Sequence, residues 1–141
     1  MAIVDLHNIT VTPLKKLLSD KGGVLHGLKS KDKEFVDFGE AYFSIINYKA
    51  TKAWKMHKLM TLNLIVPYGL IKFVFFDGEM NFREEIIGYE KYARLTVPPL
   101  VWFGFYGLFE PHSILLNIAD IAHDQDEIEL KKISDIKYSW D

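Results

Sequence analysis

The sequence contains no cysteine among its 141 residues. This absence excludes disulfides, thiolate catalysis and cysteine-ligated zinc. An excess of either charge is lacking as well, because 17 basic and 19 acidic side chains leave a formal net charge of -2. No block of basic residues could follow a phosphate backbone, so nucleic acid is not expected as a partner. No glycine-rich phosphate loop is present, and no cofactor is expected.

Long apolar runs are also lacking. The most apolar stretch, Leu62 to Phe76, is interrupted by Asn63, Pro67 and Lys72, and it is too short to span a bilayer. The segment from Met1 to His7 has neither the basic residues nor the continuous apolar run of an export signal. We therefore expect one domain over residues 1–141, no membrane partner and a cytoplasmic location.

Aromatic and aliphatic side chains are abundant, since 49% of the residues are hydrophobic and 14% are aromatic. They occur in short runs between turn signals, as in the strands of a sandwich or barrel. The sequence therefore predicts an all-β fold, with its middle strands in an antiparallel meander. The clearest predicted strands are Glu40 to Tyr48, Leu62 to Val66, Leu70 to Phe76, Tyr92 to Val97, Val101 to Tyr106 and Ser113 to Ile121.

Three segments do not fit this pattern. Thr12-Pro13 precedes leucines at helical spacing, at 14, 17 and 18, which predicts a short amphipathic helix. Glu79 to Lys91 carries apolar residues at helical spacing among charges, and we expect a long loop or one short helix there. After His123 the chain turns acidic and then basic, which is typical of a solvated terminal segment.

The stretch from Trp54 to Leu64 is the best place for a site. If it is continuously extended, Lys55, His57 and Asn63 share one polar face, because strand side chains alternate. A turn near residues 58–60 would break this register. Inside a barrel the polar face would line a pocket, whereas outside it would meet water, and His57 would then be an ordinary structural histidine.

Aromatic residues crowd the predicted strand after Pro98-Pro99. Most of Trp102, Phe103, Phe105 and Tyr106 are expected in the core. One or two, for which Trp102 and Tyr106 are the candidates, could instead stack on a sugar or base at the barrel mouth.

Four ordered blocks resemble a known family. They are Gly39 to Ser44, Ala53 to Lys58, Arg94 to Pro99 and Leu115 to Ile121. Together they resemble small cupins related to dTDP-4-dehydrorhamnose 3,5-epimerase and to nucleotide-sugar 3,4-ketoisomerases. The resemblance implies a cupin-type double-stranded β-helix, or jelly roll, with at most one or two short helices. It also implies a homodimer that acts on nucleotide-linked 4-keto-6-deoxy sugars in surface polysaccharide biosynthesis.

The resemblance also suggests roles for single residues. Lys55-Met56-His57-Lys58 is similar to the family's His-x-His-Lys motif with its first histidine replaced, so His57 matches the base that removes a proton beside the ketone. Lys55 and Asn63 are candidate donors to the enolate oxygen, by strand parity alone. The substrate-binding candidates implied by position are Lys21 and His26, where the family grips the nucleotide, and Asn117, where it places a tyrosine acid.

No metal is expected, because Lys55 takes the place of a ligand histidine and an ammonium beside a cation site is unfavourable. The leading hypothesis is an epimerase or isomerase with His57 as base. A cupin that binds a sugar nucleotide, or supports a biosynthetic partner without chemistry, is the alternative. A purely structural homo-oligomer is a third possibility.

Overall fold

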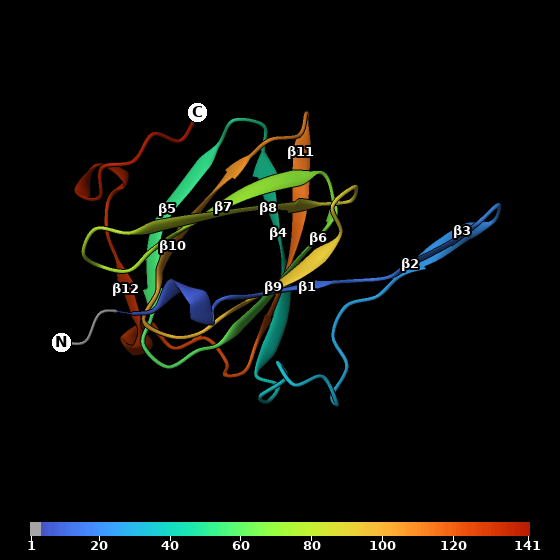
Figure 1. Ribbon diagram of the computed structural model, residues 1–141, viewed down its shortest axis with the longest axis horizontal. Coiled ribbons are helices and arrows are strands. Elements are labelled where there is room, and N and C mark those ends of the chain that lie inside the picture. The colour runs from blue at the N-terminus through green and yellow to red at the C-terminus, as the bar shows by residue number, and fades with distance from the viewer. Residues whose placement is uncertain (1–3) are drawn as a thin grey trace.

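Two antiparallel five-stranded sheets face each other and form the body of the molecule (Figure 1). The computed structural model describes residues 4–141, so residues 1–3, the start of the segment inspected for an export signal, lie outside the described residues. The first sheet has the order β1-β9-β6-β11-β4, with bounds Thr10–Pro13, Ala93–Val97, Leu62–Tyr68, His112–Ala119 and Glu40–Asn47. The second has the order β12-β5-β10-β7-β8, with bounds Ile128–Leu130, Thr51–His57, Trp102–Gly107, Leu70–Phe76 and Phe82–Gly88.

Helical structure is limited to three 3-10 turns within residues 4–141. They are η1 (Leu6–Asn8), η2 (Gln125–Glu127) and η3 (Ile133–Asp135). The predicted all-β jelly-roll class is therefore confirmed. None of the helical turns in this range has the length or apolar content needed to cross a bilayer.

The core lies between the two sheets, and β11 shows how the sequence builds it. Ser113, Leu115, Asn117 and Ala119 are buried while the residues between them are more exposed, as strand alternation requires. Apolar side chains from the facing strands complete this layer. Its fully buried members include Leu64, Val66, Ile71, Phe73, Phe75, Leu95 and Leu115.

The chain changes sheets between β6 and β7, and Gly69 makes this possible. Its φ of +93° favours glycine, and a Cβ at this position would lie 2.3 Å from the Ser113 hydroxyl. That hydroxyl accepts a hydrogen bond from the Leu70 amide at 3.0 Å. The predicted meander through these strands is therefore wrong, because the chain alternates between the two sheets from β4 to β7.

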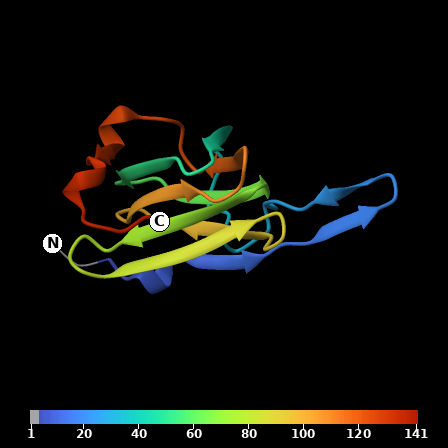
Figure 2. The same cartoon turned by 90° about the horizontal axis from the view of Figure 1, so that it is seen from above.

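The predicted helix after Pro13 is a β-hairpin instead. Strands β2 (Lys16–Ser19) and β3 (Gly22–Leu25) pair with each other and project away from both sheets (Figure 2). An amphipathic helix is stabilised mainly by packing its apolar stripe, and Leu17 and Leu18 have no such surface because both are exposed. Cross-strand hydrogen bonds form in place of the helix.

Residues 79–91 also contain a strand rather than a helix or long loop. After a turn at Asp77-Gly78, β8 pairs with β7 along its whole length. The charged residues of β8 lie at the sheet edge, where the Arg83 guanidinium donates to the backbone oxygens of Leu6 and Ile9 at 2.7 and 2.9 Å. The pairing with β7 and these contacts of Arg83 stabilise β8 as a strand despite its charged residues.

The C-terminal segment keeps most of its charged side chains exposed, as predicted, but it also packs against the fold. Strand β12 extends the second sheet beside β5. Beyond it, Ile136 and Trp140 are buried against Trp54 and Trp102 on the outer face of this sheet. The acidic and basic residues after His123 concealed this packing, because the apolar residues that follow are few and widely spaced.

Candidate functional site

Strand β5 presents two polar side chains to the interior between the sheets. Lys55 lies opposite Phe103 of β10 in the strand pairing, and Phe103 belongs to the core between the sheets. His57, two residues further along, lies on the same face, and its ring stacks on Phe103 at a centroid distance of 6.2 Å. The predicted shared face of Lys55 and His57 is therefore present and points inward.

His57 is buried together with a carboxylate. The imidazole is 5% exposed and Glu127 is 3% exposed, and His57 Nδ1 contacts Glu127 Oε1. The other carboxylate oxygen, Oε2, accepts hydrogen bonds from the amides of Leu59 at 3.1 Å and Met60 at 3.2 Å. Because an ionised carboxylate only accepts, Nδ1 carries the proton and Nε2 keeps a lone pair.

The second ring nitrogen of His57 has no partner. Nε2 is buried and makes no hydrogen bond to any residue in the range 4–141. A buried polar atom without a partner is rare and is often explained by function. The geometry therefore gives an imidazole that is oriented by Glu127 and has an available proton acceptor.

The pKa values of this pair follow from burial and from their contact. Burial lowers the pKa of His57, and the hydrogen bond and charge of Glu127 oppose this shift without cancelling it. Burial acts to raise the pKa of Glu127, but its hydrogen bonds from His57, Leu59 and Met60 outweigh burial and lower it. At neutral pH the pair is a neutral imidazole beside a carboxylate.

A cavity of about 380 Å³ lies next to Lys55, between β4 of one sheet and β5 of the other. Its lining includes three lysines and no carboxylate: Lys52, Lys55 and Lys131. Phe103 and Phe105 form an apolar wall. His57 does not line the cavity itself, but it lies behind the Phe103 ring. A positively charged, partly apolar cavity suits an anion that carries a less polar group.

The opposite wall of this cavity belongs to β4 and β11. Asn117 donates from its side-chain amide to the Ser44 hydroxyl at 3.0 Å and to the Tyr42 backbone oxygen at 3.3 Å. The Tyr42 side chain also lines the cavity. Burial, and then the charge of Glu40, raises the pKa of its phenol, so Tyr42 remains protonated at neutral pH and can donate a proton.

The sequence prediction placed Asn63 beside His57, but the structure does not bring them together. A turn separates β5 from β6, and the two strands belong to different sheets. Asn63 instead faces the outside of the first sheet, where it accepts a hydrogen bond from Thr96 at 2.6 Å and donates to the Glu34 backbone oxygen at 3.3 Å. The turn near residues 58–60 thus broke the expected register.

The other predicted substrate-binding residues are scattered. Asn117 lines the cavity, whereas Trp102 and Tyr106 pack on the outer face of the second sheet, away from it. Lys21 is exposed in the turn of the β2–β3 hairpin. His26 follows that hairpin, and its backbone oxygen accepts a hydrogen bond from the Tyr92 hydroxyl at 2.6 Å.

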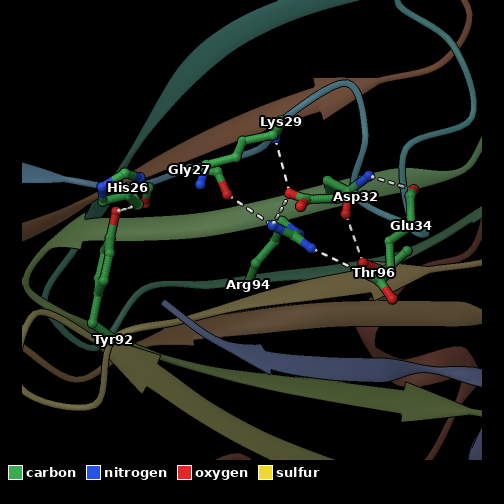
Figure 3. Close-up of polar contacts among 9 residues, drawn as sticks. His26, Gly27, Lys29, Asp32, Glu34, Tyr92, Arg94 and Thr96 are labelled. Atoms are coloured by element: carbon green, nitrogen blue, oxygen red, sulfur yellow. Dashed lines mark hydrogen bonds and ion pairs between the residues drawn. The ribbon is translucent and has the colours of Figure 1, made fainter. Parts of the chain in front are cut away.

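A second buried charged cluster lies on the outer face of the first sheet (Figure 3). Arg94 is 1% exposed. Its Nη1 donates to the Gly27 oxygen at 2.8 Å and to Asp32 at 3.3 Å, and its Nη2 donates to Glu34 at 2.8 Å. The cluster fastens the connection between β3 and β4 to the sheet, with most of its donors occupied.

Two residues of the candidate site were missed in the sequence. Glu127 was included in the acidic terminal segment, and no local signal separates it from its exposed neighbours. Tyr42 had a usable signal, because alternation along Glu40 to Asn47 places it on the same face as Ser44. No group of three or more His, Cys, Asp or Glu side chains within residues 4–141 is arranged to hold a metal ion.

Comparisons with known proteins were made for sequence families, curated proteins and solved structures. No protein-family model matches the chain, and no curated protein matches it. Among solved structures, a dTDP sugar isomerase from Desulfovibrio desulfuricans G20 is 33% identical, with a TM-score of 0.89. The match covers 94% of this chain and 90% of that chain.

Two more distant structures share the fold. A sugar 3,4-ketoisomerase from Thermoanaerobacterium thermosaccharolyticum, solved in complex with TDP, is 20% identical with a TM-score of 0.76, covering 89% of both chains. A dTDP-4-dehydrorhamnose 3,5-epimerase from Bacillus anthracis str. Ames is 17% identical with a TM-score of 0.82, covering 99% of this chain and 89% of that chain. The inward Lys55 and His57, the cavity beside them and the first of these matches show that the chain belongs to the dTDP-sugar isomerase family of cupins.

Proposed function

We propose that this protein is an epimerase or isomerase of a nucleotide-linked 4-keto-6-deoxy sugar, with His57 as the catalytic base. The observation that carries the proposal is the buried pair of His57 and Glu127, which leaves Nε2 as a proton acceptor on the inner face of the sheet. Family membership supports the substrate class. A role in surface polysaccharide biosynthesis is part of the same proposal.

The chemistry requires removal of a proton from the carbon next to the ketone. A neutral imidazole is suited to this step, because its unpartnered Nε2 can accept a proton. Glu127 holds the ring in one orientation and stabilises the imidazolium that forms. A histidine-to-asparagine variant of the Thermoanaerobacterium ketoisomerase was solved in complex with TDP-4-keto-6-deoxyglucose, which is consistent with a histidine at the centre of this chemistry.

Charge that develops on the ketone oxygen needs a donor or cation nearby. Lys55 and Asn117 line the same cavity and can provide both. Tyr42 is the candidate acid that returns the proton, since its phenol stays protonated and also lines the cavity. Lys52, an exposed lysine at the cavity, suits the diphosphate of a nucleotide.

The direct test follows exchange of sugar protons with solvent. In deuterated water, wild-type protein should incorporate deuterium at the carbon beside the ketone of dTDP-4-keto-6-deoxyglucose, as read by NMR. His57→Ala should lose this exchange, whereas Met80→Ala, an exposed change in the β7–β8 turn, should keep it. Equal exchange in wild type and His57→Ala would refute the catalytic role of His57.

A binding module without chemistry is the second candidate, and one observation favours it. His57 Nε2 is buried and does not itself line the cavity, so a ligand could bind without reaching it. Nucleotide sugars would then raise the melting temperature without any exchange of sugar protons. Stabilisation together with exchange would favour the enzyme.

The homodimer is also a proposal, supported by apolar side chains that this chain leaves uncovered. Leu18 on the projecting hairpin is 58% exposed, and Phe43 on the outer face of β4 is 68% exposed. Exposed apolar surface of this kind marks interaction sites. Leu18→Asp should shift sedimentation toward the monomer while Met80→Asp leaves the dimer intact. A wild-type protein that sediments as a monomer would contradict this assembly.

A further inference from the structure

Within residues 4–141, Lys55 is neither fully exposed, as a surface lysine would be, nor held in an ion pair, as a structural lysine would be. Its side chain enters the interior between the sheets, opposite the buried Phe103. None of the carboxylates in residues 4–141 forms an ion pair with it, and its amine makes no hydrogen bond there. The ammonium is not fully enclosed, so it meets the open space of the cavity rather than a protein partner.

The two other lysines at the cavity differ from Lys55. Lys52 is exposed, and the ammonium of Lys131 lies over the Trp102 ring, 5.0 Å from its centroid, on the outer face of the sheet. Lys52 lies on the same inner face as Lys55, because it pairs with Phe105, so the feature that distinguishes Lys55 is its partial burial. Burial, followed by the charge of Lys52, lowers the pKa of Lys55, although Glu127 partly opposes the shift. An amine that is desolvated beside another cation is the usual form of a nucleophilic lysine.

We propose that the Lys55 amine condenses with the ketone of the bound sugar to form an imine during the reaction. The proposal deepens the proposed function and rests on it, since the ketone is that of the nucleotide-linked 4-keto sugar. It gives Lys55 a covalent role in place of a purely electrostatic one.

The step balances with water as the only co-reactant. The neutral Nζ attacks the carbonyl carbon to give a carbinolamine, which takes up a proton and loses water to give a protonated imine. A base then removes the proton from the neighbouring carbon, and its electron pair moves toward nitrogen to give an enamine. Reprotonation of the same carbon from its other face restores the imine, and addition of water then releases the epimerised ketone and the free amine.

The surroundings of Lys55 fit this sequence of steps. His57 lies two residues along the same strand face, about 6.5 Å away along the backbone, so base and nucleophile approach the sugar from one side. A protonated imine withdraws electrons more strongly than a ketone does, which eases proton removal by a neutral histidine whose pKa is lowered. Phe103 and Phe105 line the cavity and limit access of water to the adduct.

The test is chemical trapping with the full-length protein. Wild-type protein mixed with dTDP-4-keto-6-deoxyglucose is treated with sodium borohydride, which reduces an imine to a stable amine. Mass spectrometry should find the mass of the sugar nucleotide minus one water plus two hydrogens, and peptide mapping should place it on Lys55 rather than Lys52 or Lys131. Lys55→Arg should lose the adduct, and Lys91→Arg, an exposed control, should keep it.

A second measurement on wild-type protein does not depend on how any variant folds. Imine formation and hydrolysis replace the ketone oxygen, so in oxygen-18 water the protein should accelerate oxygen exchange over the uncatalysed rate. Deuterium exchange with neither an adduct nor accelerated oxygen exchange would overturn the imine and leave the proposed function standing. Adduct without deuterium exchange would support the imine and refute the isomerase, and the absence of all three would refute both.

Discussion

The two charged clusters of this protein belong to different sheets and differ in how fully their polar atoms are paired. On the outer face of the first sheet, Arg94 uses both terminal nitrogens on Gly27, Asp32 and Glu34 (Figure 3). On the inner face of the second sheet, His57 uses one ring nitrogen on Glu127 and leaves the other without a partner.

This difference separates a structural cluster from a chemical one. The contacts of Arg94 all reach the β3–β4 connection and leave only Nε unpartnered, which suits a structural role in holding that connection to the sheet. The contacts of His57 orient a ring and leave a lone pair, which suits proton transfer. Each cluster contains a glutamate, and this allows the two to be compared by the same substitution.

The largest effect is expected at the glutamate of the inner cluster. Glu127→Gln removes the charge that stabilises the imidazolium but keeps the side-chain shape. We expect deuterium exchange into the sugar to fall by about 10²- to 10⁴-fold, measured by NMR at saturating substrate. Unchanged exchange would mean that Glu127 only fills space beside His57.

Arg94→Met should have the largest effect on stability. It leaves Glu34 and Asp32 without their cationic partner, and removing one partner from a buried ion pair costs about 3–5 kcal/mol. Urea denaturation should show this loss in the free energy of unfolding. Exchange per folded molecule should be retained, and its loss would show that the outer cluster is coupled to the site.

Glu34→Gln is the matched substitution in the outer cluster. It retains an acceptor for the Arg94 guanidinium and removes only the charge, which should cost about 1 kcal/mol of unfolding free energy. The exchange rate should equal that of wild type. Glu34→Gln and Glu127→Gln should therefore differ in the NMR exchange rate, which only Glu127→Gln lowers. Equal exchange rates and equal urea stabilities in the two variants would contradict the distinction between the clusters.

The smallest effect is a shift in pH dependence. Because the pKa of His57 is lowered from its ordinary value of 6.5, the base remains neutral below that pH and the acid limb of kcat/KM should lie under 6.5. Glu127 raises the pKa of His57, so Glu127→Gln should move this limb to still lower pH. A limb that does not move would argue against direct coupling between the two groups.

The same shifts predict how stability changes with pH. The pKa values of His57 and Glu127 are both lowered in the folded state, so the unfolded chain binds more protons as the pH falls. For His57 the loss of stability begins as the pH drops through its unfolded value near 6.5, and for Glu127 it begins near its ordinary value of 4.5. Urea midpoints should therefore decrease from pH 7 toward pH 4.

The strands were predictable where the sequence provides an unbroken pattern. Leu70 to Phe76 was expected as a strand and has those bounds, because an apolar run between a glycine and an Asp-Gly turn has few alternatives. Residues 82–88 were not predicted as a strand, because the apolar residues of this segment have helical spacing. The segment is a strand because it pairs with β7, which provides its hydrogen bonds. Tertiary pairing decided that segment.

The site was predictable only in part, for reasons of register and distance. Lys55 and His57 share a face because they belong to one strand, which alternation reveals. Asn63 lies beyond a turn that changes sheets, and Glu127 approaches His57 from 70 residues away in sequence. For Trp102 and Tyr106, the pattern gave the strand but not which of its two faces points inward.

The most direct measurement of the central claim is a crystal structure of the His57→Asn variant with dTDP-4-keto-6-deoxyglucose. We predict that the keto sugar occupies the cavity beside Lys55 and Asn117, with the carbon next to its ketone facing the side chain at position 57. The diphosphate should lie near Lys52. A sugar bound on the outer face of either sheet, or one whose ketone points away from Lys55 and position 57, would contradict the account.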